Sequence, residues 1–258
     1  MGLLDNVISK LHKTKITDKQ DKTVLVTGAN GFIAGHIVEG LLAKGYHVIG
    51  TVRSSAKSDP FEEFFKQKYP TGKLTYEIVK DITKAGAFDE VLKNHPEITV
   101  VLHCAASTAV GGTAKEDMKK VFLEPALEGT KGILSSIQLY APQVTDVVMT
   151  SSLSALCHDF YSLPEPREFT AKDWSTGDWD RDVGDNQLTA YSLSKAYSER
   201  AAWQFVKENQ VNYKLTTILP AVVVGPQVLE SQVTKQLNLS NQWILDMVQS
   251  VKLDSTKS

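Results

Sequence analysis

Short apolar runs alternate with longer amphipathic stretches from Thr23 onward. The apolar runs are rich in β-branched residues and predict six strands, at Thr23–Thr27, His47–Val52, Leu74–Val79, Val100–His103, Asp146–Thr150 and Leu215–Leu219. Helical periodicity predicts helices at Phe32–Lys44, Phe61–Tyr69, Ala87–Leu92, Met118–Leu139, Ala190–Glu208 and near Gln236–Val251. Continuous apolar strands are typical of a parallel sheet that is buried on both faces. The alternation therefore predicts an α/β fold, a doubly wound parallel sheet with right-handed crossovers.

Two segments depart from this pattern. Residues 1–22 are lysine-rich with apolar residues at helical spacing, and they predict an N-terminal extension that is helical or mobile. The alternative is that they bind a membrane surface or a partner. Residues 154–189 hold prolines and tryptophans among acidic residues, without regular periodicity. Such a stretch is either a substrate-side lid or binding loop, or a surface excursion whose tryptophans pack on the body.

Composition narrows the classes of function. The chain has 258 residues, of which 42% are hydrophobic, and a net charge of -2, which argues against a nucleic-acid-coating surface. No apolar run approaches the roughly 18 residues that a membrane helix needs. The two cysteines, Cys104 and Cys157, make no disulfide framework, and no His or Cys partner has metal-site spacing. We therefore expect a cytoplasmic protein that binds no metal, nucleic acid or membrane.

A glycine-rich turn with the spacing G-x-x-G-x-x-A joins the first predicted strand to the first predicted helix. Gly28 permits a tight turn, Gly31 lets a pyrophosphate approach the backbone, and Ala34 lets the helix pack closely on the sheet. The free N–H groups and the positive dipole end of the helix then favour phosphate. In this context the turn predicts a Rossmann-like dinucleotide site rather than an ordinary glycine turn.

The end of the second strand indicates which dinucleotide is bound. An NAD site places an acid there for the ribose 2′-hydroxyl. Here Arg53 and Lys57 follow the strand, with no acid between them. Arg53 can bind a 2′-phosphate bidentately and Lys57 adds charge, which favours NADPH; the alternative is that both are solvated loop cations. After the third strand, Asp81 and Ile82 can meet the adenine.

Tyr191 and Lys195 are four residues apart and share one face of a predicted helix. The ammonium group stabilises the phenolate, so the tyrosine can donate a proton to a carbonyl oxygen as hydride reaches the carbon. The fifth strand ends in Ser151 and Ser152, at the edge where parallel sheets bind ligands, and a serine there can hydrogen-bond the carbonyl. The sixth strand leads to Pro220, in a loop that can line the nicotinamide.

These motifs, in this order, resemble the extended short-chain dehydrogenase/reductase superfamily. Within it they resemble the dihydroflavonol reductase-like branch and its fungal NADPH-dependent aldehyde, ketone and methylglyoxal reductases. The matching text is V-L-V-T-G-A-N-G-F-I-A from Val24, V-L-H-C-A-A-S from Val101, V-M-T-S-S from Val148, Y-S-L-S-K from Tyr191 and L-P-A-V-V-V-G-P from Leu219. The resemblance implies an NADP-binding Rossmann domain at 23–225, followed at 226–258 by the start of an incomplete small substrate lobe.

The resemblance also implies roles for individual residues. Tyr191 would donate the proton, Lys195 would bind the nicotinamide ribose, and Ser152 matches the catalytic serine better than its neighbour. The residues implied to bind the cofactor are Gly28, Asn30, Gly31, Phe32, Ile33, Arg53, Lys57, Asp81, Ile82, Ala105, Ala106, Ser107, Tyr191, Lys195, Pro220, Val222 and Val223. Trp174 falls in the family's substrate-lobe loop, and Leu153 stands where relatives often carry an aromatic residue.

Three hypotheses for the function follow. The leading one is an NADPH-dependent carbonyl reductase that acts on a small aldehyde or ketone, as a monomer or homodimer. A sugar-nucleotide epimerase or dehydratase uses the same three catalytic residues with tightly held NAD, and Arg53 argues against it. A non-catalytic or impaired NADPH-binding protein is the third, because family members continue through more of the substrate lobe, whereas only 32 of the 258 residues follow Pro226.

Overall fold

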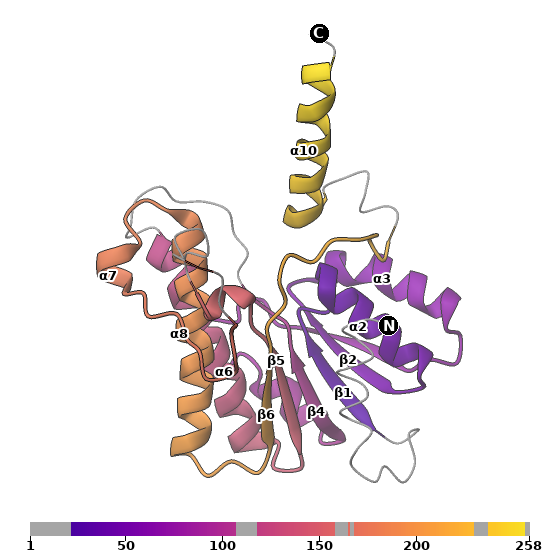
Figure 1. Ribbon diagram of the computed structural model, residues 1–258. Helices are drawn as coiled ribbons and strands as arrows, with labels where there is room; N and C mark the ends of the chain where they lie inside the picture. The colour runs from indigo at the N-terminus through magenta and orange to yellow at the C-terminus, as the bar shows by residue number, and fades with distance from the viewer. Residues whose placement is uncertain (1–21, 107–117, 158–164, 166–167, 230–236, 256–258) are drawn as a thin grey trace. The chain divides into compact units, whose positions relative to one another are not determined.

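A computed structural model describes residues 22–106, 118–157, 165, 168–229 and 237–255 (Figure 1). Three predicted features lie wholly or partly outside these ranges: the N-terminal extension except for Lys22, the cofactor-binding residue Ser107, and part of the loop at 154–189. Among the helices in the described ranges, none is both long enough and apolar enough to cross a bilayer.

Six parallel strands form one sheet in the order β3-β2-β1-β4-β5-β6. Their bounds are β1 Thr23–Thr27, β2 His47–Val52, β3 Leu74–Ile78, β4 Ile98–His103, β5 Asp146–Thr150 and β6 Lys214–Ile218. The order confirms the predicted doubly wound sheet, and the predicted strand bounds differ from these by at most two residues. The strand order reverses between β1 and β4, and open α/β sheets bind ligands at such a point, beyond the carboxyl ends of the strands.

Helices cover both faces of the sheet, with α2 and α3 on one side and α6 and α8 on the other (Figure 1). The bounds of the helices are α2 Phe32–Ala43, α3 Ser55–Lys68, α4 Asp89–Asn94, the π-helical turn η2 Lys119–Leu123, α6 Glu124–Tyr140, the 3-10 turn η3 Leu153–Ala155, α7 Trp179–Asp182, α8 Gln187–Glu208 and α10 Leu239–Ser255. The helices follow the strands in the predicted order, although the start of α3 differs from the prediction, and η2 and α6 together occupy the predicted helix at Met118–Leu139.

Helix α3 begins at Ser55, well before the predicted start at Phe61. A proline inside a helix removes a backbone hydrogen bond, so Pro60 is unfavourable within α3. The structure instead includes Pro60 within the helix, and near its start the Ser58 hydroxyl donates to the Ser55 carbonyl at 3.0 Å. Lys57 consequently lies in the first turn of a helix and not in a loop.

The main core lies between the sheet and helices α4, α6 and α8. Leu25, Ile49 and Val101 contribute from β1, β2 and β4, and Ile133 and Ile137 contribute from α6. All of these side chains are almost completely buried. This apolar contact holds the strand ends of the sheet and the helices beside them in a fixed relation.

A second core cluster holds the first half of α8. Met118, directly before η2, and Phe122, within η2, pack with Trp179 of α7 and with Leu193 of α8. Tyr191 is a partly buried member of the same packing. The cluster therefore fixes the part of α8 that carries the predicted tyrosine.

The chain divides into two compact units, residues 1–220 and 221–258. The first contains the whole sheet, and the second contains α10. The predicted domain boundary at residues 225 and 226 stays a prediction, as does the assignment of the final residues to a substrate lobe.

Candidate active site

The glycine-rich turn follows β1 directly. Gly28 has φ +64°, a left-handed conformation that favours glycine, and a Cβ there would lie 3.0 Å from the Cα of Ala105. The Gly31 N–H donates to the Gly28 carbonyl at 2.9 Å, which closes the turn. No side chain caps the N-terminus of α2 at Gly31, and no acidic residue lies in its first turn. The N–H groups at Phe32 and Ile33 are therefore the kind of group that binds a phosphate.

Thr27 joins the end of β1 to the end of β4. Its hydroxyl oxygen accepts hydrogen bonds from the backbone N–H of Cys104 at 3.1 Å and of Ala105 at 3.0 Å. Its own hydrogen is then directed to Nδ1 of His103, at 2.9 Å. Burial lowers the pKa of His103 to about 4, with a smaller contribution from the charge of Lys195. The imidazole is therefore neutral near pH 7, so it can accept this bond.

Sequence reasoning missed this Thr27–His103 contact. It sets Ala105 opposite Gly28, and so it brings two of the predicted cofactor-binding segments together. The available signal was a threonine directly before the turn glycine and a histidine at the end of the fourth strand.

Two exposed cations follow the end of β2. Arg53 follows β2, and Lys57 lies in the first turn of α3; both are exposed. Asp81 follows β3 and accepts hydrogen bonds from Thr83 N at 2.9 Å and from Thr83 Oγ1 at 2.7 Å. These bonds lower the pKa of Asp81, and the positive charge of Arg53 adds to the effect. Arg53 and Asp81 therefore lie at one edge of the sheet.

Ile82 lies against α6. Its Cδ1 would be 3.0 Å from a Cβ added at Gly129, and its side chain is half-buried at the rim of the main core. The absence of a side chain at Gly129 makes room for it. A contact between Ile82 and an adenine stays a prediction.

Tyr191 and Lys195 lie one turn apart on α8. Asn186 caps the helix, because its side chain accepts hydrogen bonds from the N–H groups of Leu188 at 2.9 Å and Thr189 at 3.1 Å. The Lys195 Nζ lies 5.8 Å from the centre of the Tyr191 ring. This distance is within the range in which an ammonium group interacts with an aromatic ring.

The charge of Lys195 also reaches the end of β4. Burial raises the pKa of the Cys104 thiol to about 11, and a hydrogen bond from Thr150 and the charge of Lys195 oppose that rise. Because the same lysine acts on His103, the ammonium group lies near the carboxyl end of β4. The end of β4 is thus near Lys195, and Thr27 joins that end to the glycine-rich turn.

Ser152 is the N-cap of η3 and lies two residues after β5 ends. Its Oγ accepts a hydrogen bond from the Ser154 N–H at 3.2 Å, and this bond leaves the hydroxyl hydrogen free to be donated elsewhere. The Leu153 N–H donates to the Pro220 carbonyl at 2.9 Å. Pro220 therefore lies beside the serine turn, at the end of β6.

Val222 and Val223 belong to the second compact unit. Within it the carbonyl of Val223 accepts a hydrogen bond from the hydroxyl of Ser240. Their predicted contact with a nicotinamide stays a prediction.

The described part of the loop at 154–189 packs on the body through its tryptophans. The Arg200 guanidinium of α8 lies 5.5 Å from the Trp174 ring centre and donates to the Ser175 carbonyl at 2.5 Å. The Ser175 N–H in turn donates to the Ala155 carbonyl at 2.9 Å. Trp179 is buried in the second core cluster. These contacts agree with a packed surface excursion, and they leave a role in substrate binding untested.

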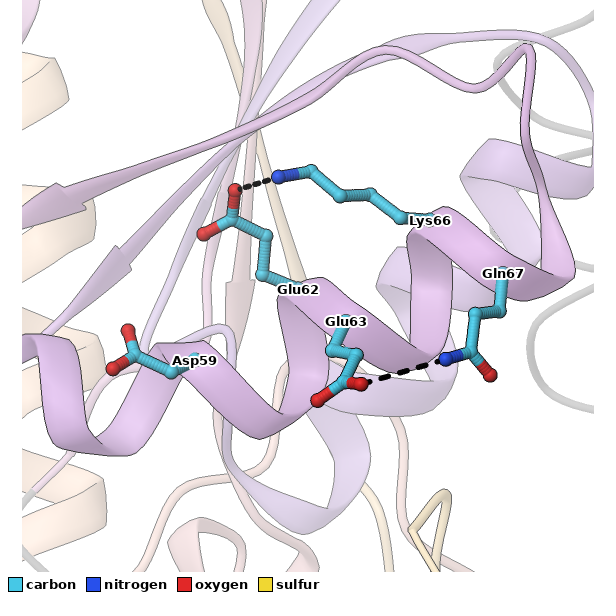
Figure 2. A pocket seen from close by; sticks show the side chains of 5 residues that line it. All are labelled: Asp59, Glu62, Glu63, Lys66 and Gln67. Atoms are coloured by element: carbon cyan, nitrogen blue, oxygen red, sulfur yellow. Dashed lines mark hydrogen bonds and ion pairs between the residues drawn. The ribbon is translucent and has the colours of Figure 1, made fainter.

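An open hollow lies along the exposed face of α3 (Figure 2). Four of its five lining side chains contact one another in pairs, since Lys66 pairs with Glu62 at 2.6 Å and Gln67 donates to Glu63 at 3.5 Å. None of the residues predicted to bind cofactor or substrate lines it. The hollow is therefore not part of the candidate site. Among the described residues, no cluster of His, Cys, Asp and Glu is arranged to hold a metal.

The family model described as "NAD dependent epimerase/dehydratase family" matches residues 24–253. The chain belongs to this family. The match covers the sheet, the glycine-rich turn and helix α8, and so it includes every described residue of the candidate site.

Relatives within this epimerase/dehydratase family include fungal reductases. "Putative NADPH-dependent methylglyoxal reductase GRP2" of Candida albicans is 43% identical over 230 residues, covering 88% of this chain and 66% of that protein. "NADPH-dependent methylglyoxal reductase GRE2" of Saccharomyces cerevisiae is 40% identical over 222 residues, covering 84% of this chain and 63% of that protein. These similarities confirm the predicted resemblance.

A solved structure shows the same fold. The crystal structure of Gre2 in complex with NADPH from Candida albicans matches with a TM-score of 0.77 and 41% identity, covering 85% of this chain and 63% of that one. The chain thus spans just under two thirds of the length of these relatives.

Proposed function

We propose that the protein is an NADPH-dependent carbonyl reductase that reduces a small aldehyde or ketone to an alcohol. The observations that support it most are the Lys195 ammonium 5.8 Å from the Tyr191 ring on α8 and the Thr27 hydroxyl that joins the end of β4 to the glycine-rich turn. The names of the relatives, which are NADPH-dependent methylglyoxal reductases, support the same class of reaction. Methylglyoxal itself is a small aldehyde with an adjacent ketone, so it is the first substrate to try.

The residues present fit an NADPH molecule. The N-terminus of α2 suits the pyrophosphate, since no side chain of the described residues caps it at Gly31. Arg53 and Lys57 are exposed, and among the described residues neither forms an ion pair, so both suit the 2′-phosphate. A Cβ at Gly31 would approach the Gly28 carbonyl to 3.1 Å, so the bare glycine keeps the turn tight. When bound, NADPH supplies the hydride.

The protein's own residues would orient the substrate carbonyl and supply the proton. The Ser152 hydroxyl would donate a hydrogen bond to the carbonyl oxygen and so orient the substrate, while keeping its own proton. Tyr191 donates a proton to that oxygen as the carbonyl carbon gains hydride, giving the alcohol and a phenolate. The positive charge of Lys195 stabilises the phenolate until solvent returns the proton.

The test is a spectrophotometric assay of NADPH oxidation with a panel of aldehydes and ketones, headed by methylglyoxal. Tyr191→Phe is expected to abolish turnover while NADPH binding, followed by its fluorescence, is retained. Arg53→Ala is expected to weaken NADPH binding by about tenfold or more and to leave NADH binding unchanged, since a charge-assisted bidentate contact is lost. No carbonyl-dependent oxidation across the panel would refute the proposal.

The same assay separates catalysis from cofactor binding alone, since saturable NADPH binding together with no turnover would refute carbonyl reduction and leave only the binding of the cofactor. The predicted monomer or homodimer is open to measurement by light scattering alongside.

A further inference from the structure

Helix α8 carries a third functional group on the face of Tyr191 and Lys195. Glu199 lies one turn beyond Lys195 and two turns beyond Tyr191, and residues at this spacing share a helix face. Its side chain is only 4% exposed. The carboxylate accepts a hydrogen bond from the hydroxyl of Ser151, which is also buried. Ser151 directly precedes Ser152, the predicted catalytic serine.

A buried carboxylate needs such a partner. Taking an ionised group out of water is costly unless it is hydrogen-bonded, and a bond to a charged acceptor is stronger than a neutral one. Ser151 is held on its other side as well, since its N–H donates to the Ile218 carbonyl of β6 at 2.8 Å. The Ser151–Glu199 contact therefore joins α8 to the ends of two strands.

We propose that Glu199 is a positioning residue, which fixes the distance between the Ser152 hydroxyl and the Tyr191 phenol through its bond to Ser151. This inference rests on the proposed function. The two hydroxyls come from different elements, the end of β5 and α8, yet one carbonyl oxygen must lie within hydrogen-bonding reach of both. The Ser151–Glu199 bond connects these same two elements, one residue from the serine and two turns from the tyrosine.

The first test compares two substitutions at one position. Glu199→Gln keeps the shape and a neutral acceptor for Ser151, whereas Glu199→Met keeps only the length. We expect Glu199→Met to lower kcat by about 10- to 100-fold, because misplaced reacting groups cost about that much. The KM for methylglyoxal and the Kd for NADPH should change by less than about threefold, since the two hydroxyls must act together on the carbonyl oxygen only in the transition state. Glu199→Gln should restore most of kcat.

The matched control is Glu208→Met. Glu208 lies near the end of the same helix, is exposed, and accepts a hydrogen bond only from Gln204 among the described residues, at 2.8 Å. We expect its kinetics to equal those of the wild type. Ser151→Ala should lower kcat as Glu199→Met does, and the double variant should be no worse than either single one, since one contact is lost in each case.

A second readout does not need turnover. Fluorotyrosine incorporated at the tyrosines gives fluorine resonances, and Tyr191→Phe identifies the one from Tyr191. We expect Glu199→Met and Ser151→Ala to shift that resonance, with Glu199→Gln and Glu208→Met leaving it in place. A Tyr191 resonance unmoved by Glu199→Met, or an unchanged kcat in that variant, would overturn the inference. A wild-type protein without carbonyl reduction would instead refute the proposed function, and the resonance would still decide whether Glu199 positions Tyr191.

Discussion

Thr27→Val should reveal how strongly the candidate site depends on one hydroxyl. Thr27 is completely buried, and valine has nearly the same shape. The substitution removes the acceptor of the Cys104 and Ala105 N–H groups and the donor to Nδ1 of His103. One buried and two partly buried polar groups thus lose their partner, while apolar packing around the side chain is kept.

The magnitude follows from those three groups. Each buried group left without a partner costs about 1–3 kcal/mol, so the low end of the range predicts a loss of about 3 kcal/mol in the free energy of unfolding. The free energy of unfolding of a typical domain is about 5–15 kcal/mol, so the variant should still fold but be much less stable than the wild type. Thr27→Ser keeps the hydroxyl and loses one methyl group, for which we expect about 1 kcal/mol.

The assay is urea unfolding followed by circular dichroism, with both variants compared with the wild type. NADPH affinity should also fall in Thr27→Val, because Ala105 is no longer held opposite Gly28. If Thr27→Val were as stable as Thr27→Ser, the bonds to β4 would contribute little, and the argument for this contact would be wrong.

Three further predictions concern the same edge of the sheet. Gly28→Ala should weaken NADPH binding at least tenfold, by titration, because alanine at φ +64° costs about 1–2 kcal/mol and its Cβ would lie 3.0 Å from the Ala105 backbone. Gly50→Ala should lower the free energy of unfolding by about 1–3 kcal/mol in urea, since its Cβ would lie 2.8 Å from side-chain atoms of both Ala29 and Tyr76. Stability should also fall as the pH drops from 6.5 to about 4, because the unfolded chain protonates His103 first and the folded pKa is about 4. The full loss is about 3 kcal/mol, and His103→Gln should remove that part of the pH dependence, as measured by urea unfolding at a series of pH values.

The strands could be predicted from sequence because their apolar, β-branched runs are long relative to the turns between them. The start of α3 could not, since Pro60 normally marks a boundary and only the local geometry around Ser55 and Ser58 shows that the helix includes it. Helix α8 began three residues earlier than its predicted start at Ala190, where the Asn186 cap sets the boundary.

In the candidate site, too, local features could be predicted from the sequence and long-range contacts could not. Local motifs predicted the residues near Gly28 and the spacing of Tyr191 and Lys195, because each is contained within one turn or one helix. The Thr27–His103 and Ser151–Glu199 contacts join residues 76 and 48 positions apart, so they depend on strand register and helix packing. No single-sequence pattern carries that information. The roles of the predicted site residues stay predictions until the variants are measured.

The pairing of β1 with β4 has a kinetic consequence. Thr27 and His103 are 76 residues apart, and closing a loop of that length costs about 4 kcal/mol in chain entropy before any contact is gained. The segment from β1 to β3 can form through neighbouring contacts, but Ala105 faces Gly28 only after β4 has joined β1. We therefore expect the contact between Ala105 and Gly28 to form late in folding. A ligand held there would slow the opening of the sheet far more than it would speed its assembly.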